Sequence, residues 1–166
     1  MGDGACVVLV GSMLAGKTTV GREVARELGV PFLDLDHALE ERTGRSPRAW
    51  IEAEGEEAFR ARESELALAA LKESAVIAFG GGTYMCPHVR AAAKGHITCY
   101  LHLAPAQAFS RLNEGERAKR PLLDGDAMKV LVERYVERDP VFREARYVID
   151  AAASLEDVVT KVVSYA

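Results

Sequence analysis

The feature that most constrains this chain is a glycine-rich segment near its beginning, Gly11-Ser12-Met13-Leu14-Ala15-Gly16-Lys17-Thr18. The segment has the pattern G-x-x-x-x-G-K-[ST], and it stands directly between the apolar run 6–10 and an amphipathic stretch. A strand, a glycine-rich turn and a helix in this order form a phosphate-binding loop, in which backbone N–H groups and the helix N-terminus surround phosphate oxygens. The motif therefore predicts an α/β fold that binds a nucleotide.

Each part of this loop has an expected role. The Lys17 side chain would reach the β and γ phosphates, and the Thr18 hydroxyl would face a magnesium ion. The residues expected to bind the nucleotide are Gly11, Met13, Leu14, Ala15, Gly16, Lys17, Thr18 and Thr19. We expect ATP as the phosphoryl donor and Mg²⁺ as its metal ion.

Short apolar runs alternate with longer segments of helical period along the rest of the chain, which is typical of an α/β domain with a largely parallel sheet. The expected strands are 6–10, 30–33, 76–79, 98–103 and 147–149. The expected helices are 17–28, 56–73, 89–94, 105–112, 127–137 and a last one that begins at Ser154, where Ser-Leu-Glu-Asp has capping-box spacing. A length of 166 residues, 49% of them hydrophobic, predicts a single domain over 1–166 with a sizeable core.

The bulk properties exclude several classes of partner. A net charge of -4 gives no general attraction to nucleic acid or to an anionic membrane, so neither partner is expected. Cys6, Cys86 and Cys99 are far apart and lack C-x-x-C spacing, which is typical of reduced thiols in the cytoplasm. The apolar run near the N-terminus is too short for a signal peptide or a membrane span. We expect a cytoplasmic monomer.

Two carboxylates and three glycines follow predicted strands. Asp34 and Asp36 share one face of an extended segment, so one can lie near the metal and the other near an acceptor hydroxyl. The same D-x-D pattern also occurs in turns and helix caps. Gly80-Gly81-Gly82 permits a ligand or another backbone to approach closely, although a flexible turn would have the same composition.

The charged stretch 113–126 interrupts the alternation of strands and helices. We interpret it as a mobile lid, and a solvated connector is the alternative.

Taken together, these motifs resemble the shikimate kinase family over nearly the whole chain. After the phosphate loop come Phe32-Leu33-Asp34-Leu35-Asp36, Arg42-Thr43-Gly44-Arg45-Ser46, Gly55–Glu63 (GEEAFRARE), Gly80-Gly81-Gly82, Arg120-Pro121-Leu122-Leu123 and Arg138-Asp139-Pro140-Val141-Phe142. The resemblance implies a three-layer α/β/α P-loop kinase fold whose five parallel strands have the order 2-3-1-4-5. It also implies phosphorylation of the shikimate 3-hydroxyl by ATP.

The resemblance also implies roles for individual residues. Asp36 would be the catalytic base at the acceptor hydroxyl, and Asp34 would help to hold magnesium, usually through water. Arg60 and Arg138 would clamp the acceptor carboxylate, since planar guanidinium groups suit bidentate hydrogen bonds. Gly81 and Gly82 would line the acceptor pocket.

Further implied roles fall on the lid and on nearby helices. Arg120 in the lid would reach the transferring phosphoryl group and, with Lys17 and Asp36, form the catalytic set. Arg111 would lie near the adenine. Glu63 would lie near the acceptor, or it would only orient Arg60 from the same helix face.

Three positions depart from the family pattern. Leu14 replaces a glycine of the loop, and leucine adopts a positive φ only at a cost. Phe142 replaces a tyrosine, and Ala151–Ala153 stands where many members place an arginine against the adenine.

Two other functions fit part of the sequence. A P-loop kinase for gluconate or a nucleoside monophosphate shares the nucleotide site, and a nucleotide-binding module without catalysis shares the fold.

Overall fold

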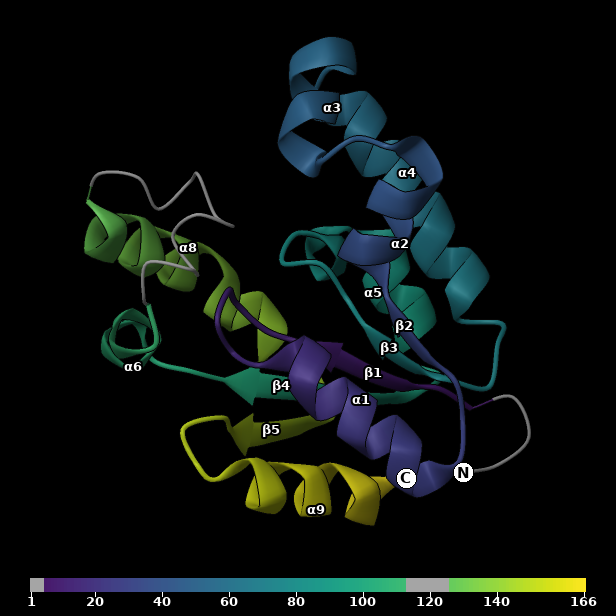
Figure 1. Ribbon diagram of the computed structural model, residues 1–166, viewed down its shortest axis with the longest axis vertical. Coiled ribbons are helices and arrows are strands. Elements are labelled where there is room, and N and C mark those ends of the chain that lie inside the picture. Colours follow the sequence, from purple (N-terminus) through teal and green to yellow (C-terminus); the bar gives the residue numbers. More distant parts are fainter. Residues whose placement is uncertain (1–4, 113–125) are drawn as a thin grey trace.

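A five-stranded parallel sheet in the order β2-β3-β1-β4-β5 forms the centre of the molecule (Figure 1). This computed structural model describes residues 5–112 and 126–166. The strands are β1 (Val7–Val10), β2 (Phe32–Asp34), β3 (Val76–Ala78), β4 (Ile97–His102) and β5 (Tyr147–Asp150). The strand order, the parallel direction and the number of strands confirm the sequence-based expectation.

The sheet order determines where ligands can bind. The chain leaves β1 toward β2 at one edge, and it later returns to β4 on the opposite side of β1. Such a change of direction opens a crevice at the carboxyl ends of the central strands. The phosphate loop follows β1, the three glycines come after β3 and Asp34 ends the neighbouring edge strand β2, so the topology gathers them at the carboxyl ends of the strands.

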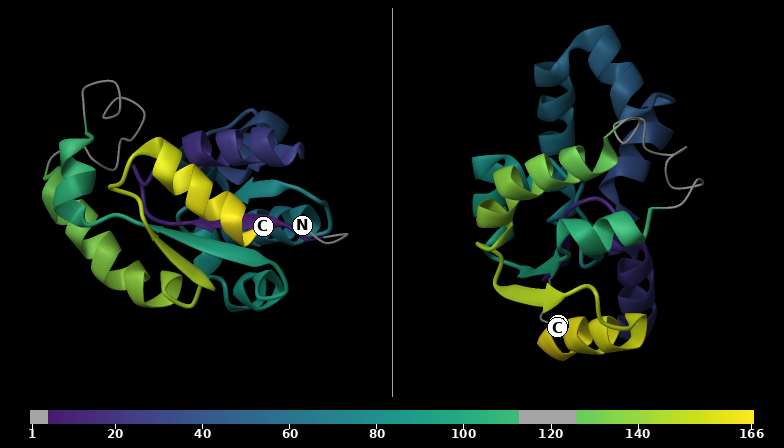
Figure 2. Two further views of the ribbon diagram at one scale, coloured as in Figure 1. Left: turned by 90° about the horizontal axis from the view of Figure 1, so that it is seen from below. Right: turned by 90° about the vertical axis from the view of Figure 1, so that its left-hand side faces the viewer.

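Helices cover both faces of the sheet and form the outer two of three layers, which the left view of Figure 2 shows edge-on. The helices are α1 (Lys17–Leu28), α2 (Leu35–Thr43), α3 (Pro47–Glu54), α4 (Glu56–Ala70), the short 3₁₀ helix η1 (Thr83–Met85), α5 (Pro87–Ala93), α6 (Pro105–Ser110), α8 (Ala127–Phe142) and α9 (Leu155–Tyr165). None of the described helices is both long and apolar enough to cross a membrane.

Side chains that alternate along each strand build two separate cores. Val8, Val10 and Ile77 point to the face covered by α4 and α5, where they pack with Trp50 and Phe142. Val7, Leu9, Cys99 and Ile149 point to the other face, which α1 and α9 cover. Period-2 alternation of apolar residues thus buries both faces of the sheet, as expected for parallel strands between helices.

Some helix boundaries differ from the sequence-based expectation. Two helices, α2 and α3, occupy residues 35–54, where the periodicity indicated none, and both begin at capping side chains, Asp34 and Ser46. The helix expected over 127–137 extends to Phe142 and contains Pro140. A proline removes one backbone donor, but packing of the surrounding helix against the sheet overrides that local preference.

Candidate functional site

The phosphate loop connects β1 to α1 in the conformation that its glycines permit. Gly16, the residue before α1, has φ 87°, in the left-handed region that glycine tolerates. The Lys17 ammonium donates hydrogen bonds to the carbonyl oxygens of Gly11 at 2.8 Å and Ser12 at 3.0 Å. The lysine therefore lies across the loop, with its charge above the space that the loop encloses.

Leu14 takes the glycine-like conformation of the loop at φ 66°, and it is the one non-glycine residue with positive φ in the described chain. The replacement therefore leaves the backbone in the left-handed region and places about 1–2 kcal/mol of strain there. The Arg111 guanidinium donates to the Leu14 carbonyl at 3.1 Å and also to the Ala151 carbonyl. Arg111 thus joins the phosphate loop to the segment after β5.

Asp34, at the end of β2, contacts Thr18, the other candidate metal ligand, and also the start of α2. The Thr18 hydroxyl donates to Asp34 Oδ2 at 2.6 Å, which places both expected magnesium ligands together. Asp34 Oδ1 accepts from the backbone N–H of His37 at 3.4 Å, so the same side chain caps α2. The helix-cap interpretation and the metal-site interpretation of D-x-D are therefore compatible. His37 is exposed and pairs with Glu41, as an ordinary polar residue of a first helical turn would.

Asp36 is in the first turn of α2 and not, as expected, on an extended segment with Asp34, and it lies at the side of the same crevice. Its residue is solvent-accessible, but protein atoms surround the carboxylate on its other sides, and this desolvation raises the pKa of Asp36 to about 6. The positive charges of Lys17 and Arg60 oppose the increase, and the negative charges of Glu63 and Asp34 add to it. The carboxylate is poised to accept a proton near neutral pH, as a general base requires.

The turn Gly80-Gly81-Gly82 has no room for larger side chains, because side chains from other elements lie in contact with its backbone. A Cβ on Gly80 would meet Asp36 Oδ1, with Glu63 Oε1 at 2.8 Å and Thr83 Oγ1 at 3.0 Å. A Cβ on Gly81 would lie 2.9 Å from Arg138 Nη1, and a Cβ on Gly82 would lie 2.7 Å from Arg60 Cζ. The close-approach interpretation of the triple glycine therefore replaces the flexible-turn interpretation.

Arg60 approaches this glycine turn from α4. Its guanidinium pairs with Glu63 at 2.8 Å and with the more exposed Glu56 at 3.5 Å. The buried Glu63 also accepts a hydrogen bond at 2.8 Å from the Thr83 hydroxyl. Glu63 is therefore placed to orient Arg60, and it also lines a cavity beside Arg60 and Arg138, so the two roles considered for it are compatible.

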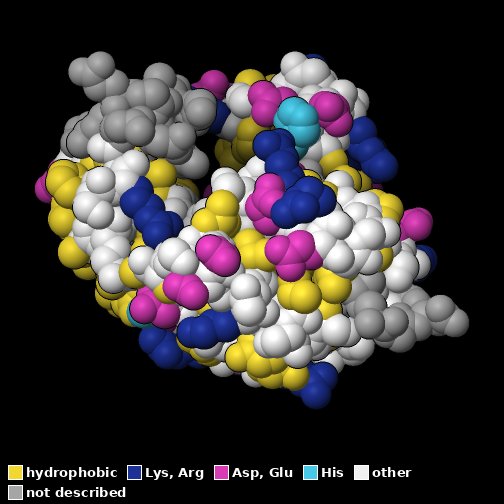
Figure 3. Space-filling model, turned by 60° about the horizontal axis from the view of Figure 1, so that its bottom comes forward, with side chains coloured by type: hydrophobic (Ala, Val, Ile, Leu, Met, Phe, Trp, Pro, Cys, Tyr) yellow, Lys and Arg dark blue, Asp and Glu magenta, His cyan; other side chains and the backbone are white. Residues whose placement is uncertain are grey.

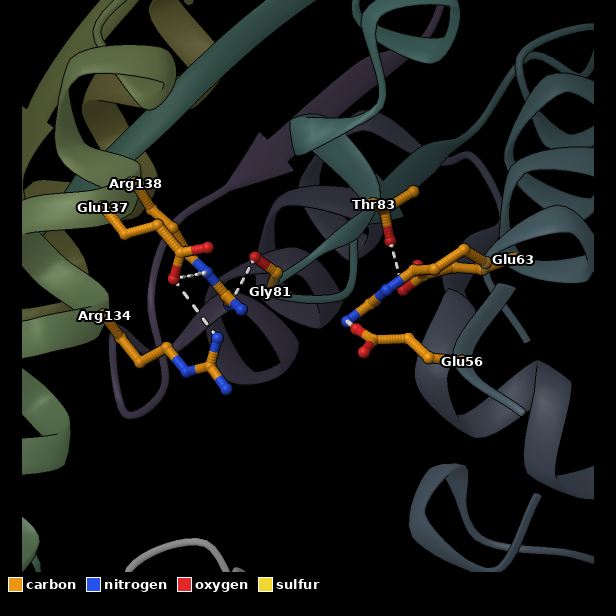
Figure 4. Close-up of polar contacts among 8 residues, drawn as sticks. Glu56, Glu63, Gly81, Thr83, Arg134, Glu137 and Arg138 are labelled. Atoms are coloured by element: carbon orange, nitrogen blue, oxygen red, sulfur yellow. Dashed lines mark hydrogen bonds and ion pairs between the residues drawn. The ribbon is translucent and has the colours of Figure 1, made fainter. Parts of the chain in front are cut away.

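Arg138 approaches the turn from α8, on the opposite side (Figure 4). Its Nη1 donates to the Gly81 carbonyl at 2.6 Å, and its Nε lies 3.7 Å from Glu137 Oε2. Glu137 also pairs with Arg134 at 3.2 Å. Desolvation lowers the pKa of Arg138, and the nearby positive charge of Arg134 lowers it further.

Two cavities meet at the glycine turn. The larger, about 690 Å³, is lined by Met13 to Val20 together with Asp34, Asp36, Ala78, Phe79, Gly81, Arg111, Ala151, Ala153, Leu155 and Val158. The smaller, about 290 Å³, is lined by Glu56, Arg60, Glu63, Ser64, Gly82, Met85, Cys86, Arg134, Glu137 and Arg138. The larger cavity contains the phosphate loop and suits a nucleotide, and the smaller cavity contains guanidinium groups that suit a carboxylate.

The structure gathers most of the predicted site residues around these cavities. Gly11 lies beneath the loop, where a Cβ would meet the Leu101 carbonyl at 2.7 Å. Arg120 and the expected lid lie outside the described residues, except for Asp126, which caps α8. Trp50 and Phe59 are core residues in edge-to-face contact at 6.0 Å.

Sequence reasoning missed Thr83, Arg134 and Glu137. Arg134 precedes Arg138 by four positions, and this helical spacing was the available signal for a second arginine on the same face. Thr83 carried no signal, because its contact with Glu63 depends on how η1 packs against α4.

Comparisons with known proteins agree with this geometry. The family model described as shikimate kinase matches residues 13–166. The chain belongs to the shikimate kinase family. A shikimate kinase of Enterococcus faecalis (strain ATCC 700802 / V583) is 36% identical over 159 residues, which cover 94% of this chain and 95% of that protein.

Solved structures place this family member among P-loop kinases. A shikimate kinase from Acinetobacter baumannii, in complex with shikimate, superposes with a TM-score of 0.87 at 34% identity and covers 96% of this chain and 91% of that one. A gluconokinase from Sinorhizobium meliloti 1021 has a TM-score of 0.61 at 17% identity, covers 97% and 90% of the two chains, and shares the fold alone. This family member is an ATP-dependent kinase that acts on a small-molecule alcohol.

Proposed function

We propose that the protein transfers the γ-phosphoryl group of ATP to the 3-hydroxyl of shikimate, giving shikimate 3-phosphate and ADP. One observation carries the proposal: a phosphate-loop cavity and an arginine-lined cavity meet at Gly81 and Gly82, with the Asp36 carboxylate beside that junction. Phosphoryl transfer depends mainly on positioning and on neutralisation of charge, and this arrangement supplies both.

The acceptor is held by its carboxylate. Arg60 and Arg138 reach the glycine turn from opposite sides, and each is partly buried, so a bound carboxylate would meet two desolvated guanidinium groups. Charge-assisted hydrogen bonds of this kind are short and directional. Gly81 and Gly82 leave the space that the acceptor ring needs.

Asp36 accepts the proton of the acceptor hydroxyl. With its pKa raised to about 6, Asp36 is still mostly ionised at neutral pH, and it is a better proton acceptor than an aspartate with the ordinary pKa. Lys17 holds the phosphates of the donor, and Arg111 anchors the loop that surrounds them. In this proposal Arg120 completes the catalytic set.

The residues near the phosphates suit a magnesium ion. Thr18 and Asp34 bring a hydroxyl and a carboxylate within 2.6 Å of each other, and Mg²⁺ prefers one or two such oxygen ligands together with substrate phosphates. When bound, the ion neutralises phosphate charge. Thr18 and Asp34 are the residues that would hold it.

We also propose a single domain over residues 1–166 that works as a cytoplasmic monomer without a nucleic-acid or membrane partner. On the face seen in Figure 3, Lys and Arg side chains lie among Asp and Glu side chains and do not gather in one basic area. Recognition of a phosphate backbone normally requires such an area.

The test is steady-state release of ADP from ATP and magnesium with shikimate, gluconate, a nucleoside monophosphate or no acceptor. We expect release that depends on shikimate. Release of ADP with another acceptor would refute the specificity for shikimate but would still support kinase activity. ATP binding without any release of ADP would favour a nucleotide-binding module that lacks catalysis.

Two variants test the roles. Asp36→Asn should abolish turnover and retain ATP binding, and Arg60→Ala should mainly raise KM for the acceptor. Full activity of either variant would refute the corresponding role.

A further inference from the structure

Helix α8 carries two polar stripes on different faces. Arg134 and Arg138, four positions apart, line the arginine cavity. Tyr135, Asp139 and Arg143 form the second stripe, also at intervals of four, so they share another face of the helix. The two stripes differ by one position along the sequence, which is about 100° around the helix axis.

The second stripe meets two side chains of β4. The Tyr100 hydroxyl donates to Asp139 Oδ1 at 2.9 Å, and Arg143 Nε donates to Asp139 Oδ2 at 2.7 Å. His102 Nε2 shares a hydrogen bond of 2.9 Å with the Tyr135 hydroxyl and lies 3.9 Å from Asp139 Oδ1. Tyr100 and His102 are two apart on the strand, so both face the helix. These five residues are called the α8–β4 polar network below.

The centre of the network, where Tyr100 meets Asp139, is shielded from solvent, whereas the Arg143 side chain at its edge is half exposed. The Tyr100 side chain is fully buried, and the Asp139 side chain is 14% exposed. Although desolvation opposes it, the hydrogen bonds from Arg143 and Tyr100 lower the pKa of Asp139, so this carboxylate stays charged. Hydrogen bonds to a charged, sheltered acceptor are stronger than neutral ones, so the contact between Asp139 and Tyr100 is a firm link.

Helix α8 needs such a link at this position. Pro140 lies inside the helix and lacks a backbone N–H, so the helical hydrogen bonding is weakened beside Arg138. Apolar contacts between a helix and a sheet are not directional, and they tolerate small rotations of the helix. Hydrogen bonds at fixed angles restrict such a rotation.

Arg138 has few direct restraints of its own. Its Nη1 donates to the Gly81 carbonyl, while its buried Nε has no hydrogen-bond partner among the described residues and only approaches Glu137 at 3.7 Å. Because Asp139 is the next residue, a rotation of α8 that breaks the contact between Asp139 and Tyr100 also displaces Arg138 relative to the glycine turn.

We propose that the α8–β4 polar network positions Arg138 for the acceptor carboxylate by holding the rotation of α8 relative to β4. The proposal rests on the proposed function, because it takes Arg138 as a carboxylate ligand. None of the five network residues lines the acceptor cavity. Their contribution to the reaction is therefore made through Arg138.

Asp139→Asn and Tyr100→Phe test the proposal, since both remove a polar contact and nearly preserve shape. We expect each to raise KM for shikimate about tenfold, with KM for ATP unchanged and kcat altered less than twofold, because misplacement of a binding group by a fraction of an ångström has effects of this size. Tyr147→Phe on the neighbouring strand β5 is the matched control, and its KM for shikimate should equal that of the wild type.

A double-mutant cycle separates positioning from general damage to the fold. In an Arg138→Lys background, Asp139→Asn should have little further effect on the dissociation constant of shikimate, because the group through which it acts is already changed. Additive effects, equal changes in both KM values, or an unchanged KM for shikimate in both single variants would overturn the proposal. If Arg138→Lys itself leaves shikimate binding unchanged, the proposed carboxylate role of Arg138 fails, and the positioning proposal fails with it.

Discussion

Replacement of Gly82 by alanine should separate substrate binding from stability at this site. Gly82 has φ −104° and ψ −19°, which alanine adopts without strain. A methyl group there would lie 2.7 Å from Arg60 Cζ and 3.0 Å from Arg60 Nη2, closer than carbon and nitrogen atoms approach without displacement. Since the obstructed group is the end of a long side chain, Arg60 moves and the backbone stays.

The size of the effect follows from the contacts that Arg60 would lose. A displaced guanidinium forfeits its hydrogen bond to the acceptor carboxylate, and such charge-assisted bonds contribute about 1.5–3 kcal/mol. That range corresponds to an increase of roughly 10- to 150-fold in KM for shikimate. Stability should change little, because alanine in place of glycine restricts the unfolded chain by about 0.4–1 kcal/mol, which offsets the altered Arg60–Glu63 pair.

Steady-state kinetics with shikimate varied at saturating ATP measure the first quantity, and thermal unfolding measures the second. Gly95→Ala is the matched control, since an added Cβ there meets no atom closer than 3.7 Å. An unchanged KM for shikimate in a folded Gly82→Ala protein would refute the argument that the absent side chain makes room for Arg60.

Three further outcomes are expected. The pKa of Asp36 is raised to about 6, so kcat/KM for shikimate should fall about tenfold per pH unit as the pH drops below that value and protonates the base, and a flat profile between about pH 5 and pH 7 would contradict it. Arg111→Gln removes the clamp on the Leu14 carbonyl and should raise KM for ATP about tenfold without changing KM for shikimate, as parallel titrations would reveal. Phe142→Ala empties a fully packed site beside Tyr84 and Tyr100 and should lower the free energy of unfolding by about 3–5 kcal/mol in urea titrations, whereas a loss below about 1 kcal/mol would show a looser core.

The sequence by itself determined the parts of this protein that depend on local backbone demands. The phosphate loop requires glycine at Gly16 and a lysine directly after it, so the motif can be recognised in the sequence without knowledge of any tertiary contact. The strands can be predicted as well, because short apolar runs are typical of parallel strands that are buried on both faces of a sheet. The Ser154 cap is local too, and its hydroxyl accepts from the Asp157 N–H at 3.1 Å.

The tertiary structure decided which distant residues meet. Nothing in the neighbourhood of Arg60 or Arg138 specifies that they reach the same glycine turn, because that meeting depends on the sheet order and on the rotation of α4 and α8. The contact between Glu63 and Thr83, and the network around Asp139, are of the same kind. Local patterns record what one segment of backbone tolerates, whereas the site depends on the packing of several segments against one another, which no single segment encodes.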